Sequence, residues 1–315
     1  PFSSSFCKAG RERLYPVHVQ TPTTTEQLRF YGKQFEALGL DGCVGCTDAT
    51  HVQLWNGAAN LRDQHQGKED YPTRKFDVTV GWSREIIYSS ASYPGKLNDK
   101  ATSDHDVFLS RIKSGVFDDD NWRRFDRDGN ASIVKRPYVV VDGGYKEEPH
   151  LMAAAAITGL VELARLGGWF GSVLKCVEDT FGIMKKRFHI LYCLRMRSLV
   201  QIDDVWFTCC VLHNMLLRED GLDDIASPYG VKMDELGLDD VDDVAALDWN
   251  QRLPGLGEQG GDAPGPAPAA VGAGLPFAPE KESFYERRRK LAEHWAYRVK
   301  VRGDVFWLNS RVHWT

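Results

Sequence analysis

The feature that most constrains the fold is a short, uninterrupted apolar run, Tyr138 to Val141, which ends at Asp142. A strand with one wet face alternates polar and apolar residues, whereas a continuous apolar run of this length predicts a strand buried on both faces. Such a strand needs a covering layer on each side. The run therefore predicts an α/β fold, with an aspartate at the end of an inner strand.

The rest of the chain predicts a mixture of strands and helices. Alternating and β-branched residues predict a strand from Cys43 to Trp55, joined in a three-strand meander by strands near 76–80 and 86–88. Apolar residues at helical spacing predict four helices. These cover about 24–38, Ser103 to a stop at Gly115, and stretches through 173–184 and 205–216, with a polar separator from Asp118 to Asn130.

Composition divides the chain into four parts. Residues 1–40 are a lead-in, 41–218 the folded domain and 280–315 a basic, aromatic terminal helix. The intervening 219–279 is acidic and then rich in Gly, Pro and Ala, so it buries too little apolar surface to offset its ordering entropy and is predicted to be a disordered linker. Its acidic part, Glu219 to Asp248, is either a solubilising spacer or a DNA mimic that occupies a basic groove.

Charge and cysteine usage exclude several classes of protein. Across 315 residues, 39 Lys and Arg against 44 Asp and Glu leave a net charge of −5, so any nucleic-acid contact must be local. The most apolar stretch, Leu151 to Ala164, is shorter than the ~20 residues that span a bilayer, so no membrane span is expected. Seven scattered cysteines favour a reducing compartment. The chain begins at Pro1 without Met, as a fragment or a processed product does.

Three carboxylates occupy positions from which a sheet and a helix can bring side chains together. Asp48 lies in the strand predicted at 43–55, Asp142 ends the buried strand, and Glu178 lies on a predicted helix. Together they can hold hard divalent cations, Mg²⁺ first or Mn²⁺, and two such ions suit phosphoryl transfer. By spacing alone the alternative is a set of solvated or capping residues, because 44 acidic residues allow many accidental triples.

Five short motifs follow one another between Leu14 and Asn214. They are Thr47-Asp48-Ala49-Thr50-His51, Pro94-Gly95 with Asn98-Asp99, Val141-Asp142-Gly143-Gly144-Tyr145, the run from Val177-Glu178 to Arg187-Phe188, and Leu212-His213-Asn214. In this order they resemble the nuclease domain of the PIF/Harbinger-type DDE transposases and their domesticated relatives. Five motifs in sequence are far more specific than any one of them.

The resemblance implies an RNase H-like fold for 41–218, a mixed sheet flanked by helices. It implies that Asp48 and Asp142 end adjacent strands, that Glu178 lies on a later helix, and that all three are catalytic and hold metal. In this family the acidic residue after the Pro-Gly break is also associated with metal, which here is Asp99. The alternative for Asp99 is a capping residue ahead of a helix near Ser103.

The sequence departs from the family pattern at three places. Ala49 stands where the family has a glycine, Asn98 where it has a histidine, and Lys175 is the nearest cation to its arginine upstream of the helix glutamate. None of these changes removes a carboxylate. Because alanine resists a positive φ, Ala49 tests whether the backbone there needs one.

Three other residue patterns have a structural interpretation beside the functional one. Cys43 and Cys46 have the spacing of zinc ligands but no second pair, which favours core cysteines. His51 either orients a phosphate or packs in its strand, and His213 is expected to be structural. The run from Arg287 to Lys290 is a DNA contact, a nuclear import signal or a partner helix.

The interpretation adopted is a metal-dependent DNA endonuclease or transposase catalytic domain, with phosphodiester hydrolysis and optional strand transfer. The alternative is a domesticated or inactive relative that binds DNA or a protein without cutting. The resemblance also implies a nuclear location, and family members rely on an N-terminal helix-turn-helix or a separate protein for specific DNA binding. Candidate contacts to the DNA backbone are Lys185, Lys186, Arg187, Arg195 and Arg197.

Overall fold

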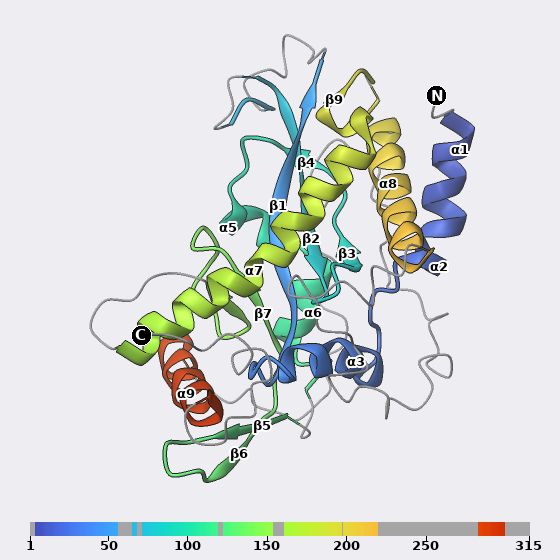
Figure 1. The fold of residues 1–315 in the computed structure, drawn as a ribbon. Coiled ribbons are helices and arrows are strands. Elements are labelled where there is room, and N and C mark those ends of the chain that lie inside the picture. Colours follow the sequence, from blue (N-terminus) through green and yellow to red (C-terminus); the bar gives the residue numbers. More distant parts are fainter. Residues whose placement is uncertain are drawn as a thin grey trace.

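A mixed sheet organised around one long strand forms the centre of the computed structural model (Figure 1), which describes residues 4–55, 65–67, 71–118, 122–153, 161–196, 198–219 and 283–299. The strand order is β3-β2-β1-β7-β8, with β4 added to β2 and β9 added to β1. The strands are β1 (Cys43–Leu54), β2 (Thr73–Val80), β3 (Ile86–Ser89), β4 (Tyr93–Pro94), β7 (Tyr138–Val141), β8 (Leu151–Ala153) and β9 (Cys193–Leu194).

The strand pairing confirms both sheet predictions. β1, β2 and β3 form the expected antiparallel meander. β7, the continuous apolar run, is buried at every residue and pairs in parallel with β1 on one side and β8 on the other. The sheet is therefore mixed, with its inner strands covered on both faces.

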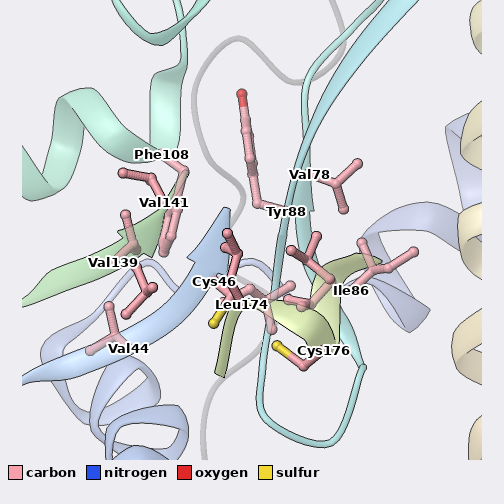
Figure 2. Close-up of a cluster of buried hydrophobic side chains, with 14 of the residues drawn as sticks. Val44, Cys46, Val78, Ile86, Tyr88, Phe108, Val139, Val141, Leu174 and Cys176 are labelled. Atoms are coloured by element: carbon pink, nitrogen blue, oxygen red, sulfur yellow. The ribbon is translucent and has the colours of Figure 1, made fainter. Parts of the chain in front are cut away.

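Helices cover the two faces of the sheet. On one face lie α7 (Val161–Arg187) and α8 (Leu199–Glu219), where Trp206 of α8 stacks on Phe76 of β2 with ring centroids 4.2 Å apart. On the other face lies α6 (Val107–Ser114), where Phe108 stacks on Tyr88 at 5.7 Å. Figure 2 shows the core between these layers, with side chains from strands and from α7 in contact. The α/β fold with flanking helices is confirmed.

The N-terminal forty residues contain more helix than the sequence predicts. The expected helix is α3 (Thr25–Glu36), which begins at a capping box between Thr24 and Gln27. Ahead of it lie α1 (Ser4–Ala9), a π-helical turn η1 (Gly10–Leu14) and α2 (Tyr15–His18). These contact α8, for example through the Thr208 hydroxyl, which donates to the carbonyl of Cys7 at 3.0 Å.

The helix expected to start at Ser103 begins later. Ser103 ends a separate short helix, α5 (Asp99–Ser103), and Asp106 caps α6 by accepting a hydrogen bond from the Leu109 N–H at 2.8 Å. The segment that joins these two short helices has little apolar periodicity, and this explains why the predicted start of the helix is wrong. The predicted stop is right, because Gly115 has the positive φ of a helix C-cap.

The polar separator and the C-terminal helix pack together. The strands β5 (Trp122–Phe125) and β6 (Ala131–Val134) form a hairpin inside and just after the separator. The helix α9 (Phe284–Tyr297) packs against this hairpin and against α7. The predicted linker at 219–279 lies outside the described residues after Glu219. None of the described helices is long and apolar enough to cross a membrane.

Candidate active site

The register of two parallel strands places Asp48 and Asp142 side by side. Cys46 of β1 pairs with Val140 of β7, so the same register carried two residues further brings Asp48 level with Asp142. Neighbouring strands lie about 4.8 Å apart. β7 ends at Val141 and β9 joins the same edge of β1 only at Gln53, so both aspartates lie where the edge of β1 passes from one partner to the next.

The helix α7 brings Glu178 to the same level. Two contacts fix how α7 runs along β1: Cys46 Sγ donates to the carbonyl of Val173 at 3.6 Å, and Lys185 Nζ donates to the carbonyl of His51 at 3.1 Å. Glu178 lies between these contacts, and its side chain is exposed. Glu178 thus adds a third carboxylate, from the solvent-exposed side of α7, to Asp48 and Asp142.

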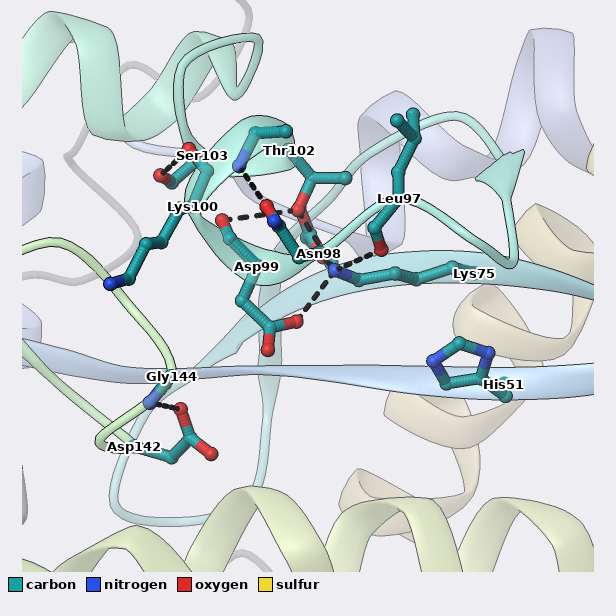
Figure 3. A network of polar contacts seen from close by, with 12 residues as sticks. His51, Lys75, Leu97, Asn98, Asp99, Lys100, Thr102, Ser103, Asp142 and Gly144 are labelled. Carbon is teal, nitrogen blue, oxygen red and sulfur yellow. Dashed lines mark hydrogen bonds and ion pairs between the residues drawn. The ribbon is translucent and has the colours of Figure 1, made fainter. Parts of the chain in front are cut away.

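Asp99 approaches from the opposite face of the sheet. It is the first residue of α5, whose N-cap is Asn98, and its Oδ1 accepts a hydrogen bond from Lys75 Nζ at 2.5 Å (Figure 3). A Cβ placed on Gly144 would lie 2.9 Å from Asp99 Oδ2 and 2.9 Å from Asp142 Oδ1. The two oxygens are therefore separated by no more than twice that distance, and Asp142 Oδ1 also accepts the N–H of Gly144 at 2.6 Å.

The carboxyl of Asp48 has a raised pKa. Burial raises the pKa of its carboxyl to about 7, a hydrogen bond from the Ala49 backbone opposes this, and the charges of Asp142, Asp99 and Glu178 add to the rise. All four carboxylates predicted from the sequence therefore share one electrostatic environment. Ala49 lies in β1 paired with Asp77, and Arg84 is the one non-glycine residue with positive φ among the described residues, so alanine fits there without strain.

The donor set suits a hard divalent cation. Carboxylate oxygens are the ligands that Mg²⁺ and Mn²⁺ prefer, and a cation would offset both causes of the raised pKa of Asp48, its burial and the nearby negative charges. Within the described ranges, no group of three His, Cys, Asp or Glu side chains is close enough as it stands to hold an ion. The residues present therefore fit a hard cation by the chemistry of their donor atoms.

Lys75 is the site residue that the sequence analysis missed. Its side chain is fully buried, and it contacts Asp99 from beneath. A lysine in a strand whose every residue is buried is an unusual combination, and the run Thr73-Arg74-Lys75-Phe76-Asp77 carried that signal. A buried lysine indicates a polar network, but only the fold shows that the partner of Lys75 is Asp99.

The residues proposed to contact DNA are only partly brought together. Lys186 is exposed near the end of α7, and the guanidinium of Arg195 lies 4.7 Å from the ring centroid of Trp55, which is 60% exposed. Lys185 and Arg187 are partly buried. Arg197 lies outside the described residues. The sequence analysis did not propose Trp55 as a DNA contact. Only the pairing of β1 with β9 shows that it lies beside Arg195.

The cysteines and histidines have structural surroundings. All seven cysteines are free, and Cys43 and Cys46 are buried in the core, as expected. His213 is buried, and its Nε2 lies 3.0 Å from the carbonyl of Arg84. His51 Nδ1 lies 2.9 Å from Thr73 Oγ1, a contact between β1 and β2. None of these contacts requires a metal or a substrate.

The basic run of α9 is largely turned into the protein. Arg287 and Arg288 are 3% and 2% exposed, and the guanidinium of Arg287 lies over the ring of Tyr138. Arg289 and Lys290 form ion pairs with Glu293 and Glu286 one helical turn away. Two of the four cations therefore support helix docking and are not available as a DNA surface.

Comparison with known protein families gives one match. The family model described as DDE superfamily endonuclease matches residues 47–214, a range that contains all four carboxylates. No curated protein and no solved structure matches the chain.

Proposed function

Because the chain belongs to the DDE superfamily endonucleases, we propose that it cleaves DNA phosphodiester bonds using divalent cations held by Asp48, Asp142 and Glu178, with Asp99 assisting. One observation carries the proposal. The register of β1 with β7, extended by two residues, brings Asp48 level with Asp142 just after β7, and an oxygen of Asp99 faces the space beside Asp142. Bound Mg²⁺ or Mn²⁺ would activate the attacking hydroxyl and offset charge on the leaving oxygen.

Each carboxylate has a separate task in this arrangement. Asp48 lies within β1 and anchors the site in the sheet, and the N–H of Gly144 holds Asp142 in one orientation. Glu178 is exposed on α7 and so faces the side from which a large substrate can approach. Asp99 is held by Lys75, which leaves its second oxygen directed toward Asp142.

The finer assignment follows from the same residues. We propose a PIF/Harbinger-type member with an RNase H-like fold and a nuclear location, in which attack by water precedes any attack by a DNA 3′-hydroxyl. Support comes from the order of the five sequence motifs and from a mixed sheet with helices on both faces. A separate DNA-binding protein would supply target specificity.

The surface beside α7 suits a DNA backbone and its bases. Lys186 and Arg195 are exposed cations, and Trp55 offers an aromatic ring just after the strand that carries Asp48. Phosphate contacts of this kind supply affinity that does not depend on sequence, and stacking adds about 1–3 kcal/mol per unpaired base.

The test is cleavage of supercoiled plasmid by the purified chain with Mg²⁺ or Mn²⁺. Wild type should nick the plasmid only with metal, and Asp142→Asn and Glu178→Gln should both lose this activity. The matched control is Asp179→Asn, which removes the next carboxylate on α7, one that pairs with Arg84 at 3.2 Å. The control should cleave at the wild-type rate.

Two other outcomes would change the assignment. Metal binding by calorimetry without cleavage would indicate dependence on a DNA-binding partner. Absence of both would favour the inactive binding module, an alternative with one observation in its favour, namely that the carboxylates do not yet enclose an ion in the described residues.

A further inference from the structure

Lys75 occupies a buried position directly behind the candidate metal site (Figure 3). Its side chain has no exposed surface, and its Nζ lies 2.5 Å from Asp99 Oδ1, 3.0 Å from Thr102 Oγ1 and 3.4 Å from the carbonyl of Leu97. A buried ammonium is stable only when it is paired and hydrogen-bonded. Asp99 is therefore its main ionic partner in this structure.

A second carboxylate, Asp77, lies two residues along β2 on the same face of the sheet. Its side chain is 1% exposed, and its Oδ1 is 3.8 Å from Lys75 Nζ. A buried carboxylate at this distance from its cation is costly and calls for an explanation. Nothing in the arrangement of the four carboxylates requires it.

The charges around Lys75 explain why Asp77 is retained. One ammonium faces two carboxylates, so the group of Lys75, Asp77 and Asp99 has one negative charge more than it can pair internally. If Asp99 shares its charge with a cation, Lys75 loses its close partner while buried. Asp77 then offers a second one, within reach of a small movement of the flexible lysine stem.

We infer that Lys75 and Asp77 are a positioning pair for the metal site, in which Lys75 moves from Asp99 to Asp77 when Asp99 binds a divalent cation. The inference rests on the proposed function, because it requires Asp99 to contribute to a cation site. Asp77 touches neither substrate nor metal. Its role is to lower the cost of releasing Asp99 from the lysine.

The inference predicts an effect whose sign a purely structural role does not produce. In Asp77→Asn, Lys75 keeps Asp99 as its one carboxylate partner, so Mg²⁺ or Mn²⁺ binding should weaken by about 10-fold or more, the usual range for residues behind metal ligands. In Lys75→Met the competitor is gone, so affinity should be at least that of wild type. The double variant should recover the affinity that Asp77→Asn loses.

The measurement is calorimetric titration of Mn²⁺ into each purified chain without DNA, with thermal unfolding in EDTA as a check on folding. Asp104→Asn is the matched control, because it removes a carboxylate from the exposed end of α5 that pairs with Lys146. Its affinity should stay within about twofold of wild type, since surface charges contribute little.

Three results would overturn the inference. These are unchanged affinity in Asp77→Asn, failure of the double variant to recover affinity, or weaker binding in Lys75→Met. The last applies even if Asp77→Asn does not fold. If wild type binds no Mn²⁺, the proposed metal site fails and the inference fails with it, whereas tight wild-type binding with an unaffected Asp77→Asn overturns the inference alone.

Discussion

Two acidic regions, one just ahead of β1 and one around Asp48 within it, differ in how their carboxylates are paired. Ahead of the strand, Asp41 is 4% exposed at its side chain and is 2.7 Å from both His294 Nε2 and Arg298 Nη1, which lie on and just after α9. Seven residues later, Asp48 lies among three further carboxylates, and the cation that contacts the group, Lys75, is bound to Asp99.

The difference shows what each region is for. A buried carboxylate that accepts hydrogen bonds from a guanidinium and an imidazole fixes the docking of α9 and needs nothing from outside. At Asp48, burial and then the charges of the nearby carboxylates raise the pKa, and this is a cost that a bound cation can offset. Paired charge therefore indicates a structural contact, and unpaired charge indicates a site.

The largest expected effect is on catalysis. Asp142→Asn should lower plasmid nicking by more than about 100-fold, because a metal ligand is lost. The same change should leave the free energy of unfolding in EDTA unchanged or higher, since it removes repulsion next to Asp48. Urea unfolding beside the nicking assay checks both parts. A variant that is both inactive and clearly less stable would make Asp142 a structural residue like Asp41.

The converse change is at the paired site. Asp41→Ala removes the buried carboxylate that pairs with the Arg298 guanidinium and accepts from His294, so the free energy of unfolding should fall by about 3–5 kcal/mol. Urea denaturation measures the loss, and the folded fraction should still cleave DNA. The control is Asp118→Ala, which breaks the more exposed pair with Arg136 and should cost about 1 kcal/mol or less. Equal losses in the two variants would contradict the comparison.

A glycine separates two of the carboxylates of the candidate site. Gly144→Ala places a methyl group 2.9 Å from oxygens of both Asp99 and Asp142, so cation affinity and nicking should each fall by about 10–100-fold. Gly168→Ala on α7 is the control, because its Cβ would meet nothing within 4 Å and alanine favours helix by up to about 1 kcal/mol. Calorimetry with Mn²⁺ decides, and wild-type affinity in Gly144→Ala would disprove the clearance role.

The pH dependence of stability should differ between the two regions. A carboxyl whose folded pKa is raised binds protons more tightly in the native state, so the stability it contributes is lost as pH rises. Asp48, with its pKa raised to about 7, and Asp77, raised mainly by burial to about 6, should make the EDTA-treated protein less stable at pH 8 than at pH 5. Urea unfolding at both values checks this, and Asp48→Asn should reduce the difference.

The smallest expected effect is on the affinity for DNA, a polyanion that must approach an acidic site. Lys186→Ala and Arg195→Ala should each weaken DNA binding a few-fold and reduce the slope of affinity against salt concentration by about one. Filter binding in Ca²⁺ at several salt concentrations measures the slope. Arg288→Met, at a buried cation of α9, should leave the slope unchanged. A shallower slope in that variant would mean that α9 contributes to the DNA surface.

Much of the fold and the site was predictable from local patterns. The apolar run before Asp142 indicates a strand buried on both faces, because no strand with a wet face tolerates it. The capping box at Thr24 and the left-handed Gly115 are local signals that hold in any context. Short helices such as α1, α2 and α5 were missed or misplaced because their stability comes from contacts, not from periodicity.

By itself, the sequence determined which residue types stand at the ends of strands and on which helix the glutamate lies, since strand and helix periods are local properties. Tertiary structure alone decided the register that makes Asp48 level with Asp142, the burial of Lys75 between Asp77 and Asp99, and the inward turn of Arg287 and Arg288. These depend on which distant segments meet, and burial then decides whether a charge is paired, shifted in pKa or left for a ligand.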